Sequence, residues 1–211
     1  MNYLKSVIKQ NQSFFLLYLV FLIFSLGLLV ISSNQSVTLF ANQHYFKLGD
    51  KLFFEVSEWA NGGLFYFIVL IVFVFQKRIG LYMLYAGILG SVVAQFMKRV
   101  LFSGSERPFK YFENSAFHLH LVEGTVIKYF NSFPSGHTTT AFCLASFLSF
   151  FSKNKFVKAI FFIYAVLVAY SRMYLGQHFF IDVIAGSLVG TISASFILVI
   201  YERNNNDNLT K

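Results

Sequence analysis

The stretch Tyr170–Asp182, YSRMYLGQHFFID, places Arg172, His178 and Asp182 between two long apolar runs. Ionisable groups are costly in hydrocarbon, so such a cluster indicates a functional site. His178 and Asp182 are four residues apart, and on a helix they would share a face, so that the carboxylate reaches an imidazole nitrogen. That contact fixes the tautomer and leaves the other nitrogen free to attack or to accept a proton. A structural His–Asp pair that caps a buried turn is the alternative.

A second stretch, FPSGH at 133–137, opens another apolar run. Its proline suits the start of a helix. Ser135 and Gly136 are expected to present backbone N–H groups at that helix N-terminus, where anions bind, and glycine allows a close approach. His137 would then lie in the first turn, facing the anion. The alternative is a helix cap followed by an incidental histidine.

A third stretch, KRVLFSGSERP at 98–108, places Lys98 at the end of an apolar run and Arg107 in the following loop, next to Pro108. Alone, these cations are equally typical of side chains that reach from a helix end to the membrane surface. Together with Arg172 and the helix N-terminus, they suit the oxygens of a phosphoryl group in transfer. One histidine then acts as a nucleophile, and the other protonates the leaving oxygen.

The composition is that of a membrane protein. Of 211 residues, 56% are hydrophobic and 12% charged, whereas soluble domains carry roughly 25% charged residues. The net charge of +8 does not indicate nucleic acid binding, because the cations lie at the ends of apolar runs, where membrane topology places them. The single cysteine, Cys143, lies within an apolar run and is expected to be a small core residue.

Six apolar runs predict an all-α bundle of six transmembrane helices in a single domain, 1–211. The runs are Phe14–Ile31, Gly63–Phe75, Ile79–Met97, Ser135–Phe151, Phe156–Tyr170 and Phe179–Ile200. We interpret the first run as a retained span rather than a cleavable signal. Residues 47–60, KLGDKLFFEVSEWA, are amphipathic and predict an interfacial helix between spans one and two. The polar tail, 201–211, is predicted to be disordered.

Lysines and arginines in the short loops predict the orientation. Both termini, the turn Lys77–Arg78 and the loop at 153–158 would be cytoplasmic. Alternation of six spans then places all three chemical stretches on the outer face of a cytoplasmic (inner) membrane.

The three stretches resemble the type 2 phosphatidic acid phosphatase superfamily, whose membrane branch contains lipid phosphatases. The family motifs are Lys-x6-Arg-Pro, Pro-Ser-Gly-His and Ser-Arg-x5-His-x3-Asp. Residues 134–137 match the second motif and residues 171–182 match the third in full. The first stretch does not match its motif in full, because eight residues rather than six separate Lys98 from Arg107. Arg99 is therefore an alternative to Lys98 as the first cation. Glu106 also departs from the motif and would partly neutralise Arg107.

The resemblance implies that His178 attacks phosphorus and forms a phosphohistidine. Asp182 would orient His178, and His137 would protonate the leaving group and then activate water. The phosphate would be held by Lys98, Arg107, Arg172, Ser135 and Gly136. No cofactor or metal is implied, because fixed cations do the work that an ion does elsewhere, and the sequence offers no carboxylate cluster for magnesium at the site.

The resemblance therefore implies a membrane-embedded lipid phosphatase whose partner is a lipid phosphate substrate. The candidates are a polyprenyl diphosphate, phosphatidic acid or phosphatidylglycerol phosphate, and a lipid A phosphate, with preference for the polyprenyl diphosphate or a general lipid phosphate. The alternatives are a lipid phosphotransferase that uses the same phosphohistidine, a vanadate-dependent haloperoxidase-like enzyme, and a non-enzymatic membrane protein. The oligomeric state stays open, and His118 and His120 are expected to be surface residues.

Overall fold

A computed structural model describes residues 3–209, and in this part of the chain helices alternate with turns and loops and no extended strand forms. The fold is therefore all-α, as predicted. The elements are α1 Tyr3–Gln10, α2 Gln12–Ile31, α3 Asn34–Gln43, α4 Lys47–Trp59, α5 Gly62–Phe75, α6 Lys77–Phe96, a π-helical turn Met97–Leu101, α7 Pro108–Phe112, α8 Gly136–Phe151, α9 Lys155–Tyr174 and α10 Phe180–Leu209.

Each of the six apolar runs folds into a helix, namely α2, α5, α6, α8, α9 and α10. Within the described residues, four segments are long and apolar enough to cross a membrane: Gln12–Ile31, Lys77–Leu101, Lys155–Tyr174 and Phe180–Asn206. The pair α4 and α5, which meet at a bend of 54°, would make a fifth. Helix α8 has 16 residues and therefore spans about 24 Å, less than the roughly 30 Å of a bilayer core. The count of six spans stays a prediction.

Helix α2 shows most directly that the bundle lies in a membrane. Its outer side exposes large apolar side chains, among them Ile23 at 63% and Phe24 at 64%. In water, so much exposed apolar surface would cost free energy along the whole helix, whereas lipid accommodates it. The chain is a multi-pass membrane protein.

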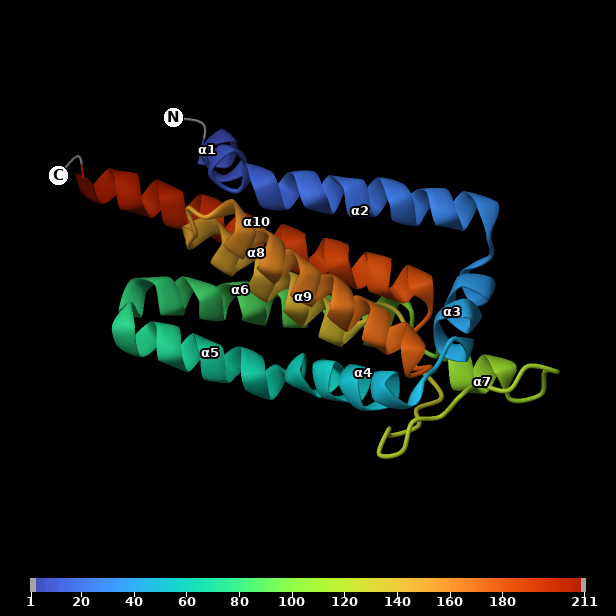
Figure 1. Cartoon of the computed structure of the whole chain (residues 1–211). Helices are drawn as coiled ribbons and strands as arrows, with labels where there is room; N and C mark the ends of the chain where they lie inside the picture. The colour runs from blue at the N-terminus through green and yellow to red at the C-terminus, as the bar shows by residue number, and fades with distance from the viewer. Residues whose placement is uncertain (1–2, 210–211) are drawn as a thin grey trace.

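Helix α8 forms the centre of the bundle, where it packs against α10, α9 and α6 (Figure 1). Its Phe142, Phe147 and Cys143 are fully or almost fully buried, so the cysteine is a core residue as expected. Helix α10 approaches α8 closely through Gly186 and Gly190. A Cβ on Gly190 would lie 2.3 Å from the carbonyl oxygen of Thr139, so only glycine permits this packing.

The region between α2 and α5 contains two helices. Helix α4 forms where the amphipathic segment predicted one, and it packs against α9 and leads into α5. Helix α3, which the sequence analysis did not predict, covers the start of α10: Thr38 Oγ1 accepts a hydrogen bond from the Phe180 N–H at 3.0 Å. The interfacial placement of α4 stays a prediction.

The prediction of a disordered tail is wrong for residues 201–209, because α10 continues to Leu209. Polar contacts to other helices hold this extension. Ser6 Oγ donates to Glu202 over 2.8 Å, Arg78 Nη1 to Asn205 Oδ1 over 3.1 Å, and Asn204 Nδ2 to Tyr82 over 2.7 Å. Residues 210–211 lie outside the described part.

The two ends of the bundle differ in what they carry. The termini lie together at one end, whereas α3, α7 and the long loop between α7 and α8 lie at the other (Figure 1). The end of α6 and the starts of α8 and α10 also point to this second end. The fold therefore brings the three chemical stretches to one end of the molecule, away from the termini.

Candidate active site

The buried pair His178 and Asp182 lies at the centre of the site. His178 Nδ1 is 3.3 Å from Asp182 Oδ2, and both residues are almost fully buried. The prediction that the two residues share a helical face is wrong. His178 precedes α10, in a turn where Gly176 adopts a φ of +61°. Asp182 lies in the first turn of α10 and its carboxylate reaches back to the turn, so the contact forms by a different local geometry.

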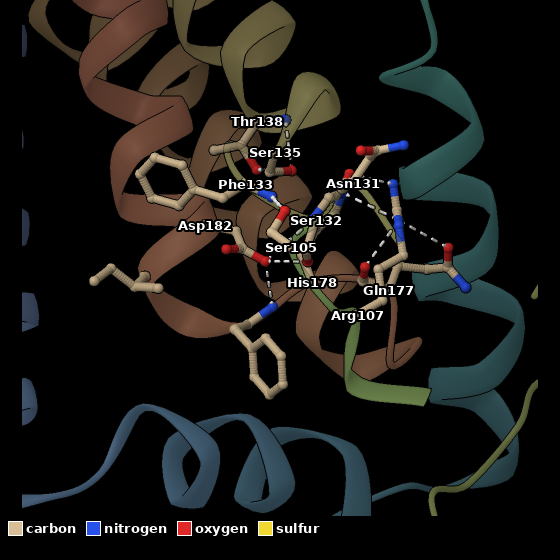
Figure 2. A network of polar contacts seen from close by, with 12 residues as sticks. Ser105, Arg107, Asn131, Ser132, Phe133, Ser135, Thr138, Gln177, His178 and Asp182 are labelled. Atoms are coloured by element: carbon tan, nitrogen blue, oxygen red, sulfur yellow. Dashed lines mark hydrogen bonds and ion pairs between the residues drawn. The ribbon is translucent and has the colours of Figure 1, made fainter. Parts of the chain in front are cut away.

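Two further donors hold the Asp182 carboxylate, as Figure 2 shows. The Ser132 hydroxyl donates to Oδ2 over 2.5 Å, and the backbone N–H of Phe179 donates to the same oxygen over 2.8 Å. Ser132 Oγ is also 3.4 Å from His178 Nδ1. The sequence analysis missed Ser132, because it lies in a loop and belongs to no motif.

Arg107 faces the other side of the imidazole. Its Nη1 is 3.4 Å from His178 Nε2 and donates to the Gln177 carbonyl over 2.9 Å, while Nε donates to the Phe130 carbonyl over 3.0 Å. An Arg guanidinium only donates, so His178 Nε2 is the acceptor and Nδ1 carries the hydrogen that points to Asp182. This tautomer leaves a lone pair on Nε2, next to a fixed cation.

The surroundings keep His178 neutral. Burial, followed by the charges of Arg107, Lys98 and Arg172, holds the pKa of His178 well below its ordinary value. A neutral imidazole at ordinary pH is the form that can act as a nucleophile.

The start of α8 differs in one respect from the prediction. The Ser135 N–H donates to the Asp182 carbonyl over 3.0 Å, and the Ser135 hydroxyl caps Thr138, so this N–H does not face an anion. The N–H groups of Gly136 and His137, at the first two helical positions, have no partner within the helix. A Cβ on Gly136 would meet no atom within 4 Å, so open space adjoins these donors.

Lys98, rather than Arg99, lies toward the site. Lys98 is half-buried in the π-helical turn, and its charge acts on His178, whereas Arg99 is exposed. A π turn takes up an additional residue, which absorbs part of the longer spacing to Arg107. Glu106 is exposed, and the carboxylate whose charge acts on Arg107 is Asp182. Glu106 therefore does not neutralise Arg107.

A cavity of about 170 Å³ adjoins this cluster. His137 and Arg172 line it, together with Ser57 from α4 and Lys128 from the loop before α8. Arg172 Nη1 donates to Ser57 Oγ. The sequence analysis missed Ser57 and Lys128, which lie far from the motifs in the chain and reach the site only through the tertiary fold.

The fold thus brings together all eight residues that the motifs indicated, around a neutral buried histidine and several cations. Among the described residues, no group of three or more His, Cys, Asp or Glu side chains is placed to hold a metal ion. Such a cluster of cations and backbone donors beside a neutral imidazole is suited to binding an anion such as phosphate. The sequence model of the PAP2 superfamily matches residues 78–206, and the chain belongs to this superfamily.

Known proteins of similar sequence include several that are named as phosphatases. The chain is 44% identical over 69 residues to the lipid A 4'-phosphatase of Porphyromonas gingivalis, a match that covers 33% of this chain and 29% of that protein. It is 28% identical over 190 residues to the undecaprenyl-diphosphatase of Sulfolobus acidocaldarius, covering 86% of this chain and 88% of that protein. Among solved structures, Aquifex aeolicus LpxE superposes with a TM-score of 0.69 at 28% identity, over 79% of this chain and 95% of that one.

Proposed function

We propose that this chain is a metal-independent lipid phosphatase that hydrolyses a phosphomonoester or diphosphate headgroup through a phosphohistidine. The observation that carries the proposal is the arrangement of His178, with Nδ1 directed at Asp182 and the Nε2 lone pair next to Arg107. Family membership and the names of the relatives support the same activity.

The mechanism follows from this arrangement. His178 Nε2 attacks phosphorus, and Asp182 stabilises the positive charge that develops on the ring. His137, in the first turn of α8, enters this step as the imidazolium, which the negative charge of the bound phosphate favours, and it protonates the leaving oxygen as the bond from phosphorus to that oxygen breaks. In the second half-reaction His137 takes a proton from water, the water oxygen attacks phosphorus, and the P–N bond breaks to release phosphate.

The charge of the transferred phosphoryl group is balanced by fixed donors. Lys98, Arg107 and Arg172 supply cations, and the N–H groups at the start of α8 supply further hydrogen bonds. Ser135 acts indirectly, because its N–H ties the start of α8 to the Asp182 carbonyl. This set needs no metal ion, so chelators are expected to leave the activity intact.

The site is proposed to face the outer side of a cytoplasmic membrane, with both termini inside. The termini and the site lie at opposite ends of the bundle, which supports this orientation (Figure 1). The bent pair α4 and α5 and the short α8 would then complete six crossings of one domain. A phosphate headgroup in the outer leaflet would reach the site from the side.

Phosphate release by the detergent-purified protein tests the proposal. The assay contains EDTA and four lipids in parallel: a polyprenyl diphosphate, phosphatidic acid, phosphatidylglycerol phosphate and a lipid A. We expect release from at least one lipid, and we expect His178→Ala to abolish it. A radiolabelled phosphoenzyme should be trapped with the wild-type protein and not with His178→Ala.

The outcomes separate the alternatives. Release that survives in His178→Ala would exclude this histidine as the nucleophile. A labelled phosphoenzyme without phosphate release, which discharges when alcohols or sugars are added, would indicate a phosphotransferase. If the folded protein neither becomes labelled nor releases phosphate, the proposed activity is refuted.

A further inference from the structure

The cavity beside His137 has polar groups that the chain itself does not satisfy. Arg172 Nε is buried without a hydrogen-bond partner, and so is Thr125 Oγ1. Both residues line the 170 Å³ cavity, and only 7% of the Arg172 surface is exposed. Buried polar atoms without partners cost free energy, so their meeting at one cavity points to a ligand that supplies the missing acceptor.

The cavity is also positively charged. Lys128 and Arg172 both line it, and the two charges are close enough to affect each other. Burial, followed by the charges of Arg107 and Arg172, lowers the pKa of Lys128. The carboxylate on the cavity wall belongs to Glu58, which is exposed and accepts from Asn61 Nδ2 at 3.5 Å. The charge of Glu58 acts on both Lys128 and Arg172 and balances part of theirs, but the side chain is exposed and can turn toward solvent when an anion enters.

The position of the cavity relative to the nucleophile decides which part of a substrate enters it. Neither His178 nor Arg107 lines the cavity, whereas His137 does. In an in-line displacement the leaving oxygen lies opposite the attacking nitrogen, next to the group that protonates it. The leaving group therefore passes His137 into the cavity.

We propose that this cavity, formed by Lys128, Arg172, Thr125 and Ser57, is a binding subsite for a second phosphate, so that the substrate is a lipid diphosphate. The proposal rests on the proposed function and specifies its substrate class. An alcohol leaving group would bring no charge to Lys128 and no anionic acceptor to the unpartnered Arg172 Nε, whereas a phosphate leaving group would bring both. The volume is several times the roughly 30 Å³ share of one liquid water, so a phosphate group fits.

The reaction balances with this assignment. His178 Nε2 bonds to the terminal phosphorus, and the bond from that phosphorus to the bridging oxygen breaks. The bridging oxygen leaves with the electron pair as part of a lipid monophosphate, which Lys128 and the unpartnered Nε of Arg172 hold. The rest of the Arg172 guanidinium stays with the terminal phosphate, and the His137 imidazolium supplies the proton. Water then releases the terminal phosphate from the histidine.

The test uses two short substrates that differ by one phosphate, farnesyl diphosphate and farnesyl phosphate. We measure kcat/KM for each with wild type, Lys128→Gln and Lys128→Arg. Because a charge-assisted hydrogen bond is lost, the preference for the diphosphate should fall about tenfold or more in Lys128→Gln and recover in Lys128→Arg. Thr125→Val should lower the same preference. Lys110→Gln, which removes an exposed lysine paired with Glu113, is the control for net charge and should keep the wild-type preference.

An equal loss on both substrates in Lys128→Gln would show that Lys128 serves the reacting phosphate and would overturn the subsite while leaving the phosphatase activity in place. If the wild-type protein hydrolyses neither farnesyl substrate, the release assay with the four lipids decides the proposed function, and binding decides the subsite. Calorimetric titration then compares methylenediphosphonate with inorganic phosphate. Tighter binding of the diphosphonate that Lys128→Gln weakens supports the subsite, and equal affinities refute it.

Discussion

The Ser132 hydroxyl donates to Asp182 Oδ2 over 2.5 Å while lying 3.4 Å from His178 Nδ1. Ser132 is thus a positioning residue, which holds the carboxylate at the distance where it orients the imidazole. It comes from the loop before α8, so the loop and the start of α10 are joined beside His178. Figure 2 shows the contact between Ser132 and the Asp182 carboxylate.

Ser132→Ala is expected to lower kcat by about tenfold, the effect of losing one hydrogen bond to a charged group. KM should change little, because the hydroxyl has no place in phosphate binding. Ser149→Ala is the matched control. Ser149 lies on α8 and is buried like Ser132, but its hydroxyl has no hydrogen-bond partner. A Ser132→Ala protein with normal kcat, or one whose whole defect lies in KM, would contradict the positioning role.

Lys98 and Arg99 are adjacent cations that the structure places differently. Lys98→Gln removes one of the charges that lower the pKa of His178, so this pKa should rise toward its ordinary value of about 6.5. Because the protonated imidazole cannot attack phosphorus, the acidic limb of the kcat/KM profile should move to higher pH. Wild-type protein should stay active at pH values where the variant is already inhibited.

Arg99→Gln is the control for Lys98→Gln, since it removes a neighbouring but exposed charge. Its acidic limb should coincide with that of the wild type. A shift in Arg99→Gln without one in Lys98→Gln would reverse the assignment of the two residues.

The sequence predicts the motif residues of the site better than the tertiary contacts that hold them in place. Short motifs with fixed spacing indicated His137, His178 and Asp182, because local spacing limits where such side chains lie. Ser132 and Lys128 escaped prediction, because each reaches the site through the tertiary fold and carries no pattern of its own. The tail shows the same limit: its composition favours disorder, and its helix is held by contacts to α1 and α6.

His120 is a further example, since it was expected to be a surface residue. Its Nε2 lies 2.9 Å from Asp50 Oδ1, which also accepts from the Tyr174 hydroxyl at 2.6 Å. These contacts join the loop before α8 to α4 and to the end of α9. The loop that carries Lys128 is therefore attached at a second point away from the nucleophile.

Tyr174→Phe tests the stability that this attachment contributes. The ring stays, but Asp50 loses a donor, so the free energy of unfolding should fall by about 1–3 kcal/mol. Thermal unfolding in detergent would show the loss as a lower Tm. Tyr66→Phe removes the hydroxyl of a tyrosine that is 46% exposed on α5 and should leave Tm unchanged. Equal Tm values for all three proteins would mean that the attachment contributes no stability.

Gly186 determines how closely the start of α8 approaches the Asp182 carbonyl. A Cβ at this position would lie 2.5 Å from the Ser135 carbonyl oxygen and 3.1 Å from Thr138 Cβ. Because a backbone atom cannot yield as a side chain does, Gly186→Ala must push α8 away from α10 and strain the bond from the Ser135 N–H to Asp182. A displacement of about 1 Å in a catalytic group can cost roughly a hundredfold in rate.

We therefore expect Gly186→Ala to lower kcat strongly, because His137 moves with the start of α8 while His178 stays with α10. Gly27→Ala on α2 is the matched control, since a Cβ there meets no atom within 4 Å, and its kcat should equal that of the wild type. Single-turnover measurements follow the formation of the phosphoenzyme and its hydrolysis separately, and His137 acts in both half-reactions. If the first half-reaction and the release of phosphate both proceed at wild-type rates in Gly186→Ala, the close packing of α8 on α10 does not set the distance between His137 and His178.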